Sequence, residues 1–253
     1  MTVALDPAAL VAFLLALSRA TAWLTIAPPF NTRMIPIPVK IGFSAALALA
    51  VTPKVAASLG PTQLDTAQMI GAVVLQVVAG AGLGFIALVL FSSVSAGGSL
   101  IDLFGGFAVA QAYDPFLNNQ ASVFGRFYQL LATTLLFAIG GHLVLVKGFM
   151  TSFDALPLRG PNLASLGSVL VNDVGLFFLA AVEIAAPLLA ALFLAQVVLG
   201  MLARAAPHLN IFALSFPFTI LLTLTLAGLA LPLVSQAVNS IVHNIFHSTS
   251  LLR

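Results

Sequence analysis

The sequence predicts an all-α polytopic membrane protein with about six hydrophobic helices. Of its 253 residues, 61% are hydrophobic and only 6% are charged, whereas a soluble globular domain carries roughly a quarter charged residues. The mean hydropathy of +1.15 over the whole length leaves no long polar stretch that would build a soluble domain. The apolar stretches are continuous runs, which is the pattern of membrane helices and not of alternating strands.

Six apolar runs are each near or above the ~20 residues that cross ~30 Å of hydrocarbon as a helix. The first is expected to start at Asp6-Pro7, an N-cap followed by proline at the first helical position, and to end before Pro28-Pro29. The other five runs cover residues 41–59, 67–91, 127–150, 169–201 and 211–234. We therefore expect a single membrane domain over residues 1–253.

Residues 92–126, between the third and fourth runs, are richer in Gly, Ser, Asn and charge than the rest of the chain. Gly-Gly pairs at 97–98 and 105–106 lower the cost of leaving helical geometry, and Asp-Pro at 114–115 adds turn chemistry. We predict broken helix and loop here, which membranes tolerate only against protein or water. The predicted pore plug consists of Gly105, Gly106, Phe107, Tyr113, Asp114, Pro115 and Phe116. An ordinary loop at the rim of a pore is the alternative.

Two charges lie inside apolar runs, Arg19 and Glu183. Each would cost ~2.5–3.5 kcal/mol at the centre of a lipid-facing helix, so both must face protein or water. A structural ion pair or a polar contact at a subunit interface is the favoured interpretation, and a proton or ion pathway is the other. The candidate intramembrane polar or assembly residues are Arg19, Asp102, Glu183, Arg204 and Asn210. Asn210 is expected to cap a helix that starts at Ile211, after a turn interrupted by Pro207.

Several features argue against a cofactor or a catalytic site. Gly80, Gly82 and Gly84 lack the strand that precedes a dinucleotide fingerprint, whereas Gly80 and Gly84 form a small-xxx-small pair that lets two helices approach closely. The chain has no cysteine, so Cys-ligated metal sites are excluded. His243 and His247 share one face of a plausible C-terminal helix, but that pattern is more typical of a partner-facing end than of a metal site. We expect no enzyme activity, no cofactor and no metal.

Three stretches resemble the FliR family, the export-gate subunit of the flagellar type III secretion apparatus, whose injectisome relatives are the SctT-type proteins. The first is Arg19 with APPFNTRMIP at residues 27–36. The second starts with Gly-Gly-Phe at 105–107 and Asp-Pro at 114–115 and continues to the Gly-His pair at 141–142. The third, RAAPHLNIF at residues 204–212, is the most specific.

The resemblance implies a scaffold that assembles with FliP and FliQ around a narrow pore for unfolded export substrates, above FlhB and the FlhA ring. It also implies a place in the bacterial inner membrane at the flagellar basal body, among its ring proteins and membrane lipid. Independently of the resemblance, the net charge of +2 does not support a nucleic acid partner, which would need clustered Lys and Arg. The resemblance further implies a FliP-like part, residues 1–160, joined to a FliQ-like helical hairpin, residues 161–253.

Three alternatives to a flagellar export subunit remain open. The first is the SctT-type injectisome equivalent. A small-solute secondary transporter is less favoured, because it should show paired inverted repeats with matched broken helices, and the sequence has one broken segment without a partner. An intramembrane enzyme would need an acid/base or metal constellation, which the sequence does not offer.

Overall fold

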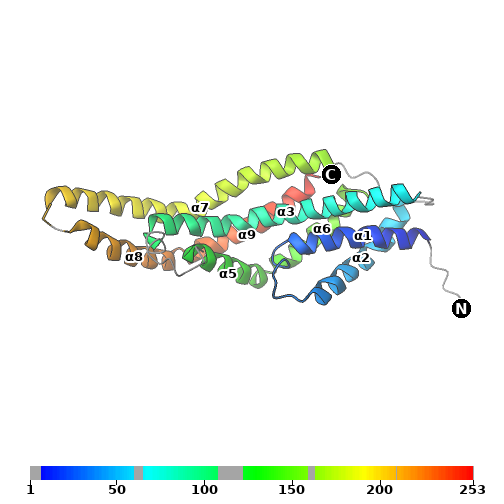
Figure 1. Cartoon of the computed structure of the whole chain (residues 1–253), viewed down its shortest axis with the longest axis horizontal. Helices are drawn as coiled ribbons and strands as arrows, with labels where there is room; N and C mark the ends of the chain where they lie inside the picture. The colour runs from blue at the N-terminus through cyan, green and yellow to red at the C-terminus, as the bar shows by residue number, and fades with distance from the viewer. Residues whose placement is uncertain (1–6, 60–64, 108–121, 159–162, 209, 253) are drawn as a thin grey trace. The chain divides into compact units, whose positions relative to one another are not determined.

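The computed structural model describes residues 7–59, 65–107, 122–158, 163–208 and 210–252. Every regular element in these residues is a helix, which confirms the predicted all-α fold. The eight helices of the described residues are α1 (Pro7–Ile26), α2 (Ile37–Leu59), α3 (Thr66–Phe104), α5 (Val123–Ala138), α6 (Gly141–Ala155), α7 (Leu163–Ala205), α8 (Ile211–Leu229) and α9 (Leu231–Ser250) (Figure 1).

Four helices, α1, α2, α3 and α7, are each long and apolar enough to cross a membrane, and two bent pairs raise the number of candidate spans to six. The predicted run at 127–150 is in fact two helices, α5 and α6, because Gly140 adopts a left-handed φ of +72° between them. The last run likewise divides into α8 and α9, bent by 57°. Pro232 at the start of α9 has no N–H to continue the hydrogen bonds of α8.

The prediction of broken helix at Gly97-Gly98 was wrong, because α3 continues without interruption to Phe104. A Cβ built at Gly97 would lie 3.0 Å from the carbonyl oxygen of Ala181, and one at Gly98 would lie 2.5 Å from that of Phe124. Both glycines are therefore sites of close helix approach. A glycine can break a helix or allow a neighbouring helix to approach closely, and here the close approach explains the two glycines.

The chain divides into two compact units. Unit 1 contains residues 1–90, 140–175 and 242–253, and unit 2 contains residues 91–139 and 176–241. Helices α3, α7 and α9 contribute residues to both units. The predicted division near residue 160 is a different one. It separates a FliP-like part from a FliQ-like hairpin by resemblance, and it stays a prediction.

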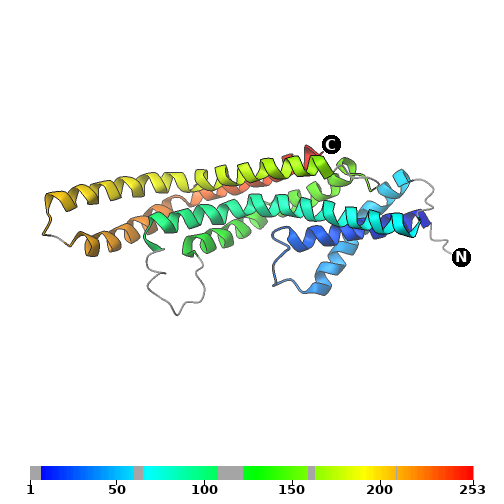
Figure 2. The same ribbon diagram turned by 45° about the horizontal axis from the view of Figure 1, so that its top comes forward.

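In unit 1, the core forms where α3 approaches α1 and where α1 lies beside α2, as both views show (Figure 1, Figure 2). A Cβ at Gly80 would collide with the carbonyl oxygen of Arg19, and one at Gly84 would lie 3.0 Å from that of Trp23. The predicted small-xxx-small contact is confirmed, with α1 as its partner. The ring of Trp23 stacks on Phe149 of α6 with centroids 4.6 Å apart.

In unit 2, α8 returns beside the second half of α7 (Figure 2). Asn210 caps α8, since its Oδ1 accepts a hydrogen bond of 3.2 Å from the N–H of Ala213, as predicted. Gln196 of α7 donates from Nε2 to the carbonyl of Phe104 at 3.0 Å. This bond satisfies one of the carbonyls that the C-terminal end of α3 leaves without a helical partner.

Replacing Gly80 by Ala is expected to lower stability by about 1–3 kcal/mol, because the added methyl group has to push α3 away from α1. The matched control is Gly71→Ala in the same helix, where nothing lies within 4 Å of the new Cβ. This control should be neutral or stabilising by about 0.5–1 kcal/mol, because alanine favours helix. The measurement is the temperature at which the chain aggregates after detergent extraction from the membrane of its native host. Equal effects of the two variants would contradict the close approach.

Candidate functional site

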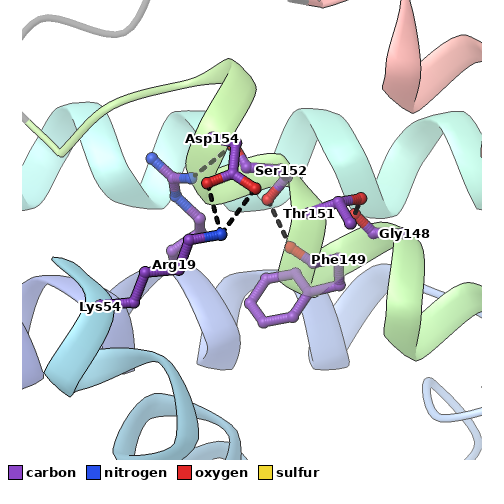
Figure 3. A network of polar contacts seen from close by, with 7 residues as sticks. All are labelled: Arg19, Lys54, Gly148, Phe149, Thr151, Ser152 and Asp154. Carbon is purple, nitrogen blue, oxygen red and sulfur yellow. Dashed lines mark hydrogen bonds and ion pairs between the residues drawn. The ribbon is translucent and has the colours of Figure 1, made fainter.

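The first candidate site, in unit 1, surrounds the fully buried guanidinium of Arg19 (Figure 3). Its Nε donates to Oε1 of Gln76 in α3 at 2.6 Å. Its Nη1 and Nη2 donate to the carbonyl oxygens of Ser152 and Leu156, at 3.3 Å and 2.7 Å. The guanidinium carbon also lies 4.3 Å from the centre of the Phe153 ring, within the range of a cation–π contact.

The geometry explains how a membrane helix can carry this arginine. The carbonyls of Ser152 and of the C-cap residue Leu156 lie at the C-terminal end of α6, the negative end of its dipole, and that of Ser152 also accepts from the N–H of Leu156 at 2.8 Å. The planar guanidinium of Arg19 supplies N–H donors and a positive charge at this end of α6. The carbonyls therefore receive donors, and the buried positive charge is compensated. Arg19 therefore joins the C-terminal end of α6 to α1.

Gln76 extends the contact and was missed by the sequence analysis. It is fully buried, and its Nε2 donates to the carbonyl of Leu158 at 2.9 Å while its Oε1 accepts from Arg19. Gln76 precedes Gly80 by one helical turn, so the close approach that Gly80 permits also brings the carboxamide to Arg19. The available signal was a glutamine well inside an apolar run, four residues before a small residue.

An ion pair near this site is exposed and contributes little. Nζ of Lys54 lies 2.6 Å from Oδ1 of Asp154, and the two side chains are 65% and 36% exposed. Ion pairs of this kind are worth about 0–1 kcal/mol. Figure 3 shows the pair beside Ser152, where Arg19 reaches the backbone of α6. Arg19 and Lys54 thus form a natural comparison of a buried and an exposed cation.

The second candidate site, in unit 2, is the buried carboxylate of Asp102 near the end of α3. It accepts hydrogen bonds from the hydroxyl of Ser122 and, at 3.1 Å, from the N–H of Phe124. Ser122 in turn caps α5 by accepting from the N–H of Gly125 at 2.8 Å. A carboxylate at a helix N-terminus is favoured by the helix dipole. Asp102 therefore joins the C-terminal end of α3 to the N-terminal end of α5.

The first part of the predicted plug lies directly after α3. Gly105 is buried, and a Cβ there would lie 2.7 Å from Oγ1 of Thr223 in α8. Gly106 has a φ of +84°, a conformation that residues with a Cβ rarely adopt. The ring of Phe107 packs edge-on against Phe124, with centroids 5.3 Å apart.

Phe107 also lines an apolar cavity of about 340 Å³ in unit 2. The other lining residues come from α5, α8 and the start of α9, and they are Val123, Phe124, Phe127, Leu224, Ala227, Gly228 and Leu231. The remaining plug residues, Tyr113, Asp114, Pro115 and Phe116, lie outside the described residues. The plug therefore stays a prediction.

The other predicted residues occupy different environments. Arg204 is exposed in the last turn of α7, where a positive charge favours the helix dipole. Glu183 is exposed along α7, so its role as a polar contact at a subunit interface stays a prediction. The sequence analysis also missed Asp173 of α7, which is buried and accepts a hydrogen bond of 2.8 Å from the hydroxyl of Ser248. Its signal was a further acidic residue within an apolar run.

Replacing Arg19 by Ala should destabilise the chain by about 3 kcal/mol, because Oε1 of Gln76 and the carbonyl of Leu156 lose the donors of Arg19 in a buried site. Lys54→Ala should cost less than about 1 kcal/mol. Arg19→Lys should lie closer to Ala than to the native chain, since one ammonium group lacks the planar fork. The aggregation temperature after detergent extraction from the membrane of the native host measures all three variants. If Arg19→Ala matched Lys54→Ala, the buried network would not be a stabilising element.

Comparison with known proteins identifies the family. Residues 10–245 match the family described as "Bacterial export proteins, family 1". The flagellar biosynthetic protein FliR of Pectobacterium carotovorum subsp. carotovorum is 31% identical over 229 residues, which cover 90% of this chain and 87% of that protein. FliR of Escherichia coli (strain K12) is 30% identical over 232 residues, with 91% and 88% coverage. The Yop proteins translocation protein T of Yersinia pestis is 28% identical over 212 residues, with 82% and 81% coverage. The chain therefore belongs to family 1 of the bacterial export proteins, the FliR family that its motifs resemble, and is a membrane component of type III protein export.

Proposed function

We propose that this chain is a non-enzymatic subunit of the flagellar type III export gate, which builds with FliP and FliQ homologues the pore for unfolded flagellar proteins. The observation that carries the proposal is the family match over residues 10–245. The injectisome equivalent is the second candidate, and the Yersinia translocation protein favours it. The flagellar relatives have the higher identities, so we place the flagellar system first.

The dimensions of the helices support an assembled role. At 1.5 Å per residue, the 39 residues of α3 and the 43 of α7 amount to about 58 Å and 64 Å of helix. Each is about twice the ~30 Å of a hydrocarbon layer. Both helices are nevertheless apolar along their length and carry exposed large side chains such as Phe85 and Phe193. Neighbouring subunits would cover the surface that one bilayer cannot.

The proposal extends to the inner membrane at the flagellar basal body, with FlhB and FlhA homologues and the basal-body ring as further partners. It also includes the two-part organisation, with residues 161–253 as a FliQ-like hairpin. The antiparallel arrangement of α7 and α8, joined at residues 206–210, supports that part of the proposal.

We further propose that residues 105–119 form the pore plug. Asp102 joins the end of α3, before the segment, to Ser122 and the start of α5, after it, and Gly106 provides a backbone conformation that permits a turn directly after α3. Aromatic rings at 107, 113 and 116 would exclude water and ions from a narrow lumen in the absence of substrate.

Expressed alone, the chain should be extracted mainly as aggregate, because its exposed apolar surface lacks partners. Coexpression with FliP and FliQ homologues from the same bacterium should give one monodisperse complex. Size-exclusion chromatography after detergent extraction provides the measurement. A monodisperse monomer whose yield does not change with the partners would contradict the assembled role.

Deletion of the chain in its host separates the two export systems. The flagellar assignment predicts that filament assembly is lost while injectisome secretion continues.

Phe107→Ala and Phe116→Ala in the assembled complex should raise ion conductance in planar bilayers before export is lost. The matched control is Phe218→Ala, a half-exposed ring of α8 outside the segment, which should leave conductance unchanged. The composition of the complex has to be verified for each variant. Conductance at the native closed level in both plug variants, with assembly intact, would show that the segment does not close the pore.

A further inference from the structure

The outer face of α7 in unit 2 forms one continuous apolar stripe. Its exposed residues follow the spacing of three and four that places side chains on a single helix face. Phe178, Leu194 and Met201 are 63%, 63% and 68% exposed. The other exposed apolar residues of this stripe are Leu179, Val182, Ala186, Ala190, Phe193, Val197 and Val198. The buried face, with Ala185, Leu188 and Leu192, points to the interior of the unit.

Glu183 lies on this stripe and is its single charged residue. It is near the middle of α7, 20 residues after Leu163 and 22 before Ala205. Its neighbours one turn away, Leu179 and Pro187, are apolar and offer no donor. The described part of the chain gives its carboxylate neither a hydrogen bond nor an ion pair.

A carboxylate in this position fits neither lipid nor a core. An ionised group on a lipid-facing helix is strongly disfavoured, and intramembrane acids pair with a cation or face water. Arg19 shows how this chain satisfies a charge that it keeps for itself, with every contact supplied internally. Glu183 has the opposite arrangement, since an exposed apolar surface surrounds an unmatched negative charge.

We propose that the stripe from Phe178 to Met201 binds a membrane helix of a different subunit, which places a lysine or arginine against Glu183. The apolar side chains supply the packing surface, and the carboxylate fixes which helix binds and in what register. A second copy of the chain is disfavoured, because a two-fold contact on this stripe would bring two Glu183 carboxylates together. The inference rests on the proposed assembled role and specifies the chemistry of one partner.

The test uses the full chain in its host membrane, with p-benzoylphenylalanine in place of Phe178 or Phe193 to capture the neighbour on illumination. Mass spectrometry of the adduct identifies the captured helix and its basic residue. We expect an adduct with a different chain, whose yield falls by about tenfold in Glu183→Lys and by less in Glu183→Gln. Glu183→Gln preserves the shape of the side chain and keeps the experiment interpretable if the lysine variant is not inserted.

An exchange of the two charges tests the ion pair most directly. Replacing the captured basic residue by Glu should restore the adduct in Glu183→Lys but not in the control Val198→Lys, which puts a lysine elsewhere on the same stripe. An adduct with a second copy, an adduct with lipid alone, or a yield that neither Glu183 variant changes would overturn the proposal.

The outcome also separates this inference from the proposed function. If export subunits copurify with the chain but none is captured from Phe178 or Phe193, the stripe is not the interface and the export role stands. If a basic helix is captured and rescued by charge reversal, but belongs to a protein outside the export apparatus, the stripe is confirmed and the proposed function is wrong.

Discussion

The packing of unit 1 depends on one interaction, the satisfaction of the buried Arg19 guanidinium by oxygens of α3 and of the C-terminal end of α6. An unpaired charge there would be too costly to retain. The bonds to Gln76, Ser152 and Leu156 fix the positions of three helices at once. The close approach at Gly80 is the steric condition for this arrangement, since α3 has to touch the backbone of α1 for Gln76 to reach the site.

A charge in unit 2 also needs hydrogen-bond donors or an opposite charge, and the chain itself supplies them for one acidic residue but not for another. Asp102 receives its donors from Ser122 and the start of α5, so this charge is satisfied internally. Glu183 is not, and it lies on an apolar face of a helix about twice as long as a hydrocarbon layer is thick. A family of export-apparatus components accounts for such a surface, because a subunit of an assembly leaves part of its apolar area for its neighbours.

The sequence predicted features whose physical cause is local. Proline at position 7, the Pro28-Pro29 pair and the Asn210 cap set helix ends through a few adjacent residues, and the structure confirms them. It did not predict the fate of Gly97-Gly98, because glycine serves both a helix break and a close contact, and only the approach of α5 and α7 decides. The partners of Arg19 were beyond reach for the same reason, since they lie 57 to 137 positions away. The resemblance of the motifs indicated the family without knowledge of the packing at Gly97-Gly98 or of the partners of Arg19.

Neighbouring subunits, and not lipid, should cover much of the exposed apolar surface. The chain has no cysteine, so single spin labels can be placed at exposed leucines on three helices, Leu130, Leu194 and Leu221. Collision with oxygen, which concentrates in the hydrocarbon, reports whether lipid reaches each label. The collision rate is expected to fall at these positions when partner subunits are coexpressed with the chain. Unchanged rates at all three positions in a complex that contains the partners would contradict the coverage by neighbouring subunits.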